Sequence, residues 1–324
     1  MKNLKTTKFE KIIEEKFAYE VTGIQEDVQQ YSEEIITELV AGTRTAELIP
    51  IQEGIKYKES FRLLSTSLTA QANTDCERNP LGDIILSDKD IAVTGIKFNM
   101  DFCNKTLIGN WGQLGLRPGT MIEKEELPFA DQIIAKLVKD VKKINEDLMW
   151  KGNTLLPTAN LNKIDGWIKK FKAAGVVNVN TTETSWTLTN VVDSLYALRN
   201  ALSTEVLEGN HAIFVGRELF DLYCQAQTNA NLFHFNPINN RMEVPLHGTN
   251  TMIQLIPALS GTNEAFAGLV DFMKIGTDLV SDMDTFDVYY DRAGGGKLFV
   301  DIEYRLGVEF VYENEFKRLE LVAS

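Results

Sequence analysis

The residues of this chain that could do chemistry lie in a glycine-rich stretch, a group of spaced aspartates, and a few histidines and cysteines. Residues 293–298, AGGGKL, superficially resemble a phosphate-binding loop. Such a loop needs an earlier glycine at a fixed spacing, a serine or threonine after its lysine, and a helix that follows. Here a leucine follows Lys297, and the flanking residues are typical of strands. We therefore interpret the segment as a turn between two strands.

Three aspartates, Asp282, Asp284 and Asp287, are close enough in sequence to suggest a cation site. The segment lacks the central glycine and the final glutamate of a calcium-binding loop. Met283 and Phe286 interleave with the aspartates, as apolar residues do in a half-buried strand. We interpret this segment as the solvated edge of a strand.

The remaining candidates are three histidines and three cysteines: His211, His234, His247, Cys76, Cys103 and Cys224. The histidines share no metal-ligand spacing with one another or with a cysteine, and no histidine signature for nucleophilic catalysis accompanies a cysteine. Three widely spaced cysteines argue against a disulfide framework and indicate a reducing compartment. We predict no catalytic, cofactor-binding or metal-binding residues, and hence no enzyme activity.

The composition is that of a soluble globular protein that does not grip nucleic acid. Hydrophobic residues make up 44% and charged residues 24% of the 324 residues. The formal charge of −13 argues against a surface that neutralises phosphates. No apolar run is long enough to span a bilayer, and the start of the chain lacks the apolar core of a signal peptide. At this length we expect two lobes that share a scaffold.

The centre of the chain predicts one long amphipathic helix over residues 128–150. Its apolar residues recur at the spacing of one helical face: Phe129, Ile133, Ile134, Leu137, Val138, Val141, Ile144, Leu148 and Met149. Pro128 suits the first helical position, and Gly152 can end the helix in a left-handed conformation. A rod of about 35 Å with a single apolar face must lie across a sheet.

The residues before this helix predict an arm and an extended loop. Residues 1–45 are polar and helical in pattern. Residues 96–102 alternate as a half-buried strand, and the opposite phase of Ile91 and Val93 predicts a β-bulge at Thr94-Gly95. We expect this strand to pair with Leu48–Tyr57. Because two strands cannot bury all the apolar residues from 91 to 102 between themselves, we expect a neighbouring subunit to cover them.

The residues after the long helix predict an inserted α/β lobe followed by long strands. Thr187 or Thr189 is expected to cap a helix, which is followed by a strand at His211–Val215 and a helix at Arg217–Gln227. A strand at Met252–Ile256 ends at Pro257. From Ala265 to Leu321 the pattern is that of strands, with a turn at 293–296.

This order of parts resembles the major capsid proteins of tailed bacteriophages, which have the Hong Kong 97-type fold. Several local patterns resemble that family: Glu146-Asp147 with Trp150 and Gly152, Asp165-Gly166-Trp167, AIFVGRELFDLYCQAQ running into Leu232-Phe233, Leu246-His247-Gly248, and Arg305-Leu306-Gly307. Thr249-Asn250 depart from it, since relatives often carry a proline soon after that glycine. The absence of a long N-terminal scaffolding segment implies a separate scaffolding protein, or none.

The resemblance implies an α+β fold with an N-terminal arm, an extended β-hairpin loop, a long spine helix, and peripheral and axial lobes. By similarity the parts are placed as follows: arm 1–45, extended loop 46–110, peripheral domain 111–186 with the spine helix at 128–150, axial domain 187–264, and return strands of the peripheral domain 265–324.

The implied function is a structural shell protein. Hexamers and pentamers of the chain would form an icosahedral capsid, assembled in the cytoplasm of a bacterial host, around double-stranded DNA that it borders without sequence-specific binding. Its other partners would be scaffolding, portal and decoration proteins, with no membrane and no cofactor. An encapsulin-like nanocompartment with an enzyme cargo, another virion component, and an α/β enzyme of unknown chemistry are the alternatives. The long arm and extended loop favour the virus.

Overall fold

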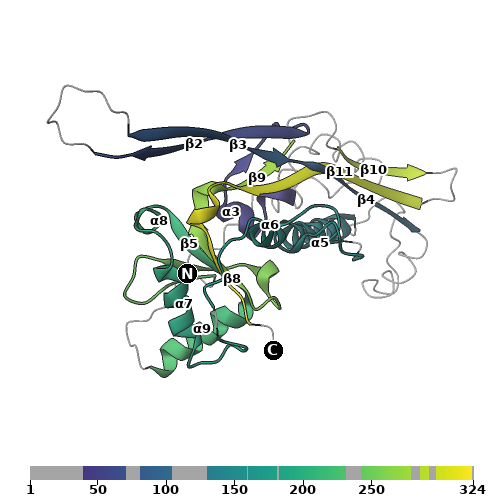
Figure 1. The fold of residues 1–324 in the computed structure, drawn as a ribbon. Helices are drawn as coiled ribbons and strands as arrows, with labels where there is room; N and C mark the ends of the chain where they lie inside the picture. The colour runs from purple at the N-terminus through teal and green to yellow at the C-terminus, as the bar shows by residue number, and fades with distance from the viewer. Residues whose placement is uncertain are drawn as a thin grey trace, which may run out of the picture.

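The computed structural model describes residues 39–70, 81–103, 130–158, 160–180, 182–230, 242–278, 285–291 and 297–322. In these ranges the chain forms two five-stranded sheets and a separate two-stranded hairpin, with helices packed against the sheets (Figure 1). This confirms the predicted mixture of helix and sheet. Most of the predicted arm, residues 1–38, lies outside the described ranges, as does the asparagine-rich loop at 231–241.

The first sheet is organised around its longest strand. Its members are β1 (Ile51–Gln52), β4 (Thr94–Cys103), β9 (Met273–Thr277), β10 (Thr285–Asp291) and β11 (Lys297–Phe310). The first half of β11 pairs antiparallel with β10 on one edge and with β4 on the other, and its last residues pair with β9. The strand predicted at the aspartates is confirmed for residues 285–291. The predicted glycine turn, 293–296, lies outside the described ranges, and the strands on either side of it, β10 and β11, are antiparallel.

The long helix is present as α5 (Ala130–Lys151) and lies along the first sheet (Figure 1). Its buried apolar side chains, Val138, Val141, Leu148, Met149 and Trp150, join the main hydrophobic core, whereas Leu137 is half-buried. The hydroxyl of Tyr304 on β11 donates a hydrogen bond to Asn145 Oδ1 on this face. The helix therefore packs on the sheet through the predicted stripe.

Gly152 ends α5 for a different reason from the predicted one. It does not have a left-handed backbone conformation. A Cβ atom at Gly152 would lie 2.6 Å from the carbonyl oxygen of Ile164, and the amide of Gly166 donates to the Gly152 carbonyl at 2.8 Å. Glycine is needed here because two backbone segments touch. The contact places α6 (Trp167–Ala173) beside the end of α5.

The predicted strand pairing before the helix is wrong. β4 pairs with β11 and not with Leu48–Tyr57, of which only Ile51 and Gln52 form a strand, parallel to β9. The hairpin instead consists of β2 (Lys58–Leu68) and β3 (Gly82–Ala92). No β-bulge is needed at Thr94-Gly95, because the chain leaves the hairpin at Val93 and enters the other sheet. Alternation of apolar and polar residues indicates a strand but does not identify the strand with which it pairs.

The second sheet has the order β12-β8-β5-β7-β6. Its strands are β5 (His211–Val215), β6 (Glu243–Pro245), β7 (Met252–Leu255), β8 (Ala265–Leu269) and β12 (Lys317–Leu319). The predicted strand His211–Val215 is confirmed, and α7 (Val191–Asn200), α8 (Thr204–Glu208) and α9 (Arg217–Asn229) accompany the sheet. The boundary expected at residue 264 falls between two strands of this sheet, because β8 pairs with β5.

The start of α7 agrees in part with the prediction. The residue before its first helical residue is Asn190, which has a helical backbone conformation and makes no side-chain capping hydrogen bond. Thr187 caps the turn that leads into the helix: its hydroxyl accepts from Asn190 N at 3.4 Å, and its amide donates to Asn190 Oδ1 at 2.7 Å. Its carbonyl accepts from Val191 N at 3.1 Å, so the turn runs directly into α7.

Candidate interaction surface on the hairpin

The β2–β3 hairpin projects beyond both sheets (Figure 1) and exposes apolar side chains on one face. Leu64 pairs with Leu86 and Thr66 pairs with Ile84, and cross-strand partners point to the same side. The four exposed aliphatic residues on this side are Leu64 (54% exposed), Leu68 (84%), Ile84 (65%) and Leu86 (73%). We call these four residues the apolar face. A cluster of exposed large aliphatic residues marks a surface that another molecule covers.

The opposite side of the outer hairpin is more polar. It carries Ser65, Ser67, Asp83 and Ser87, with Ile85 exposed and Leu63, the partner of Ser87, half-buried. The strands are therefore amphipathic, although neither side of the outer hairpin packs on the body of its own chain. The sequence pattern placed this region within the extended loop 46–110 without predicting strands at 58–68 and 82–92, so it did not reveal the apolar face. The alternation Leu64-Thr66-Leu68 with Ile84-Leu86 was the available signal.

Three of the apolar residues that were expected to need a neighbour are instead buried within the chain. Ile91 and Val93 form a small buried cluster with Ile55 at the root of the hairpin, and Phe61 packs against it. Ile96 belongs to the main core. For these three the expectation was wrong, because the first sheet and Ile55, which the local pattern does not reveal, cover them. Phe98 and Met100 are half-buried, and the side chain of Phe102 lies outside the description.

Polar contacts hold the root and middle of the hairpin against the body. Lys89 Nζ lies 2.8 Å from Glu313 Oε1 and 5.0 Å from the ring centroid of Phe310, a cation–π arrangement. The hydroxyl of Tyr312 donates to the Leu64 carbonyl at 3.4 Å. Arg305 donates to the Lys56 carbonyl and lies 3.3 Å from the buried carboxylate of Asp278. The outer part of the hairpin is thus held out from the body in a defined direction.

A second polar junction ties the N-terminal end of the described chain to the long helix. α3 (Arg44–Leu48) presents Thr45, whose amide donates to Glu146 Oε2 at 3.2 Å and whose hydroxyl donates to Glu146 Oε1. Trp150 Nε1 donates to the same hydroxyl oxygen at 2.8 Å. Burial raises the pKa of Glu146, while the hydrogen bonds from Thr45 act in the opposite direction.

We predict that Thr45→Val costs about 2–3 kcal/mol of unfolding free energy at pH 7.5, because it removes a hydrogen bond from a buried carboxylate. The folded-state pKa of Glu146 is raised above its usual 4.5, so the native state gains protons first as the pH falls. Loss of the hydroxyl raises this pKa further, so the cost of the substitution should shrink from pH 7.5 towards pH 5. Urea titrations at several pH values measure this.

Thr45→Ser is the matched control, since it keeps the hydroxyl and should lose much less stability at either pH. A cost for Thr45→Val that is the same at pH 7.5 and pH 5 would show that Glu146 does not carry the effect.

Three of the residues that carried the family resemblance, Trp150, Trp167 and Phe214, meet in one aromatic cluster. Trp150 on α5 packs against Trp167 on α6, with ring centroids 5.1 Å apart. It also packs on Phe214 of β5 at 5.5 Å and on Phe266 of β8 at 6.0 Å. Trp150 therefore joins the first sheet's helix to the second sheet, and the cluster is a packing centre.

The described histidines and cysteines that were candidates for chemistry lie apart from one another in the fold. His211 is buried, and its ring nitrogens contact Gly209 O at 3.0 Å and Thr251 Oγ1 at 2.8 Å. The amide of His247 donates to the hydroxyl of Tyr223. Cys224 is half-buried on α9, where burial raises the pKa of its thiol. His234 and Cys76 lie outside the described ranges. Within those ranges no three or more His, Cys, Asp or Glu residues gather as a metal site.

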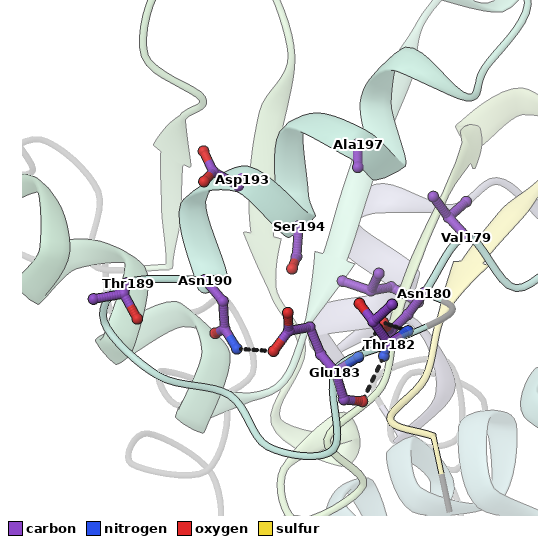
Figure 2. A pocket seen from close by; sticks show the side chains of 10 residues that line it. Val179, Asn180, Thr182, Glu183, Thr189, Asn190, Asp193, Ser194 and Ala197 are labelled. Carbon is purple, nitrogen blue, oxygen red and sulfur yellow. Dashed lines mark hydrogen bonds between the residues drawn. The ribbon is translucent and has the colours of Figure 1, made fainter.

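One polar hollow of about 300 Å³ lies between α7 and the segment 179–183 (Figure 2). The carboxylate of Glu183 points into it and accepts from Asn190 Nδ2 at 2.6 Å, and Ser194 faces this carboxylate from the helix. Val179 and Leu319 provide apolar walls. The described lining of the hollow includes two carboxylates, Glu183 and Asp193, but no histidine, cysteine or lysine.

Comparison with known proteins identifies the fold. No family model and no curated protein matches the sequence. Among solved structures, a chain of the satellite phage P4 procapsid, in a structure that includes the size-determination protein, matches with a TM-score of 0.57 at 13% identity, over 90% of this chain and 100% of the other. The chain has a phage capsid fold. The capsid of Myoviridae phage XM1 matches with a TM-score of 0.57 at 14% identity over 88% and 92% of the two chains. Mycobacterium phage Ogopogo matches with a TM-score of 0.55 at 12% identity over 86% and 91%.

These matches confirm the predicted resemblance to phage capsid proteins at the level of the fold. They cover nearly the whole of this chain and of its structural relatives, so the fold is shared as a whole and not through one lobe. None of the described helices is both long and apolar enough to cross a bilayer.

Proposed function

We propose that this chain is the major capsid protein of a tailed bacteriophage and assembles into an icosahedral shell around double-stranded DNA. The observation that carries the proposal is a phage capsid fold over 90% of the chain. The apolar face supports it independently, because a projecting hairpin with exposed aliphatic residues needs a partner. A second copy of the chain supplies that partner in every contact of a shell.

In this proposal the fold is of the Hong Kong 97 type. α5 is the spine helix, the first sheet and α5 form the peripheral domain, and the second sheet with α7–α9 forms the axial domain. The hairpin is the extended loop, with its root at residues 55–61 and 91–93. The arm is proposed at 1–45, and its described residues run into the start of α3. Copies meet around capsomer axes through the axial domain, and the hairpin reaches a neighbour.

The role is structural, and no catalytic residue is proposed. The charge of −13 fits a shell that encloses DNA without neutralising its phosphates. Hexamers and pentamers of the chain would contact scaffolding, portal and decoration proteins. The mature protein would reside in the virion capsid after assembly in the bacterial cytoplasm.

Expression of the full chain, followed by sedimentation and negative-stain microscopy, tests the proposal. The expected result is closed shells or capsomers that sediment far ahead of a monomer of 36.5 kDa. A protein that stays monomeric at all concentrations, alone and with phage-infected cell extract, would refute it. Particles that contain a co-purifying enzyme in place of nucleic acid would instead indicate a nanocompartment.

A further inference from the structure

Two glycines lie directly opposite each other beneath the root of the hairpin. Gly276 on β9 pairs with Gly307 on β11 in the antiparallel register. Neither glycine has a positive φ, so backbone conformation does not require glycine at either position. Lack of space requires glycine at both positions, because the root of the hairpin packs directly on the backbone of the two glycines.

The distances show how closely the root lies on this pair. A Cβ atom at Gly307 would lie 2.1 Å from the carbonyl oxygen of Ala92. A Cβ atom at Gly276 would lie 2.8 Å from Ile91 Cδ1, 3.0 Å from Ile55 Cδ1 and 3.1 Å from Val93 Cγ1. Real Cβ contacts are rarely this short. At Gly307 the clash is with backbone, so a side chain there would displace the root. At Gly276 the clash is with three aliphatic side chains of the root, which would have to shift. We call Gly276 and Gly307 the glycine seat.

The glycine seat differs from other glycines in the same sheet. Gly95 on β4 pairs with Arg305 of β11, and nothing lies within 4 Å of the position of a Cβ atom there. Close packing therefore requires a glycine at the seat but not at Gly95. Backbone hydrogen bonds fix the same root, with Ile55 N donating to Thr277 O at 3.1 Å and Val93 N donating to Tyr57 O at 3.0 Å.

The hairpin acts as a lever on this seat. Each strand has eleven residues, which at about 3.4 Å per residue gives a reach of about 35 Å. A displacement of about 1 Å across the first 10 Å of the root would move the far end by about 3–4 Å. The apolar face lies on that outer part, so small changes at the seat become large changes in where the face meets its partner.

We propose that the glycine seat limits the range of angles at which the hairpin leaves the body and thereby restricts the curvature of the closed shell. The inference rests on the proposed function as a shell protein. Hexamers and pentamers of one chain meet at slightly different angles, so a shell of one size needs the range of these angles to be narrow. The seat limits that range by packing, because a root lying on bare backbone has one closest approach.

Gly276→Ala tests the proposal, with shell diameter measured by cryo-electron microscopy. We expect folded subunits that form open sheets or shells with a changed diameter. Ile91→Val removes the Cδ1 atom that lies nearest to the new methyl group, so the Gly276→Ala/Ile91→Val variant should regain the wild-type diameter. Gly95→Ala is the matched control and should leave the diameter unchanged.

A thermal melt of each variant separates positioning from folding. If Gly276→Ala does not fold, Ile91→Val alone serves as the second variant, because it loosens the same contact and should broaden the distribution of diameters. Wild-type diameters for folded Gly276→Ala, an unchanged distribution for Ile91→Val, or failure of the double variant to recover would each overturn the proposal. Wild-type protein that forms no shell at all would refute the proposed function instead.

Discussion

Replacing Ile84 by serine is expected to lower the yield of closed shells at least tenfold, whereas the same replacement at Ile85 leaves the yield near that of the wild type. The two residues are adjacent on β3 and similarly exposed, at 65% and 57%, but they point to opposite sides of the hairpin. Only Ile84 belongs to the apolar face. Because both are exposed in the isolated chain, neither change should alter folding stability by more than about 0.5 kcal/mol.

The size of the effect follows from what a subunit contact would bury. Covering an isoleucine side chain contributes about 1.5–3 kcal/mol, and every 1.4 kcal/mol is a tenfold change in affinity. A shell repeats the contact in every subunit, so the loss accumulates during closure. Sedimentation and negative-stain microscopy of both variants at matched concentrations measure the yield. Equal yields for the two would show that the apolar face does not contact a neighbour.

Replacing Trp150 by alanine is expected to destabilise the subunit by about 3–5 kcal/mol, the usual range for removing a large aromatic residue from a core. Trp150 is fully buried and packs on Trp167, Phe214 and Phe266, so the change opens a cavity between the two sheets. Since whole domains are stable by only about 5–15 kcal/mol, much of the protein should be unfolded at 37 °C. The midpoint of urea unfolding measures the loss.

Two further variants separate packing from hydrogen bonding at this position. Trp150→Phe keeps an aromatic ring but loses the hydrogen bond to Thr45, so it should cost clearly less than the alanine change. Trp186→Ala removes a half-buried tryptophan whose Nε1 donates to the Asn263 carbonyl at 2.8 Å, and it should also cost less. Equal midpoints for Trp150→Ala and Trp186→Ala would contradict a central packing role for Trp150.

Much of the fold could be predicted from the sequence because it depends on local periodicity. The stripe along α5, the strand at His211–Val215 and the helix that follows it each bury one face, and burial of a face sets the pattern of residues. The order of these elements was sufficient to predict the phage capsid fold. The glycines at 152 and 166 were also visible as part of a pattern, although their purpose was not.

The candidate interaction surface depended on tertiary structure. The sequence pattern predicted no strands at 58–68 and 82–92, and only their mutual register in the structure shows that Leu64, Ile84 and Leu86 share a side. Conversely, the local sequence predicts that Ile91, Val93 and Ile96 are uncovered by their own chain. In the fold they are buried by packing against β9, β11 and Ile55. Which apolar residues remain uncovered is a property of the whole fold.

The sequence by itself therefore determined the elements with a clear local period, such as α5 and the strand at His211–Val215, and the apolar face of α5, because these follow from neighbours within a few residues. Only the tertiary structure decided which strand pairs with which, where the chain changes sheets at Val93, and why Gly276 and Gly307 must lack side chains. These features depend on contacts between residues that are far apart in the sequence, in some cases by more than two hundred positions, as for Ala92 and Gly307. A local pattern cannot encode such distances, because the same alternation of residues satisfies many partners.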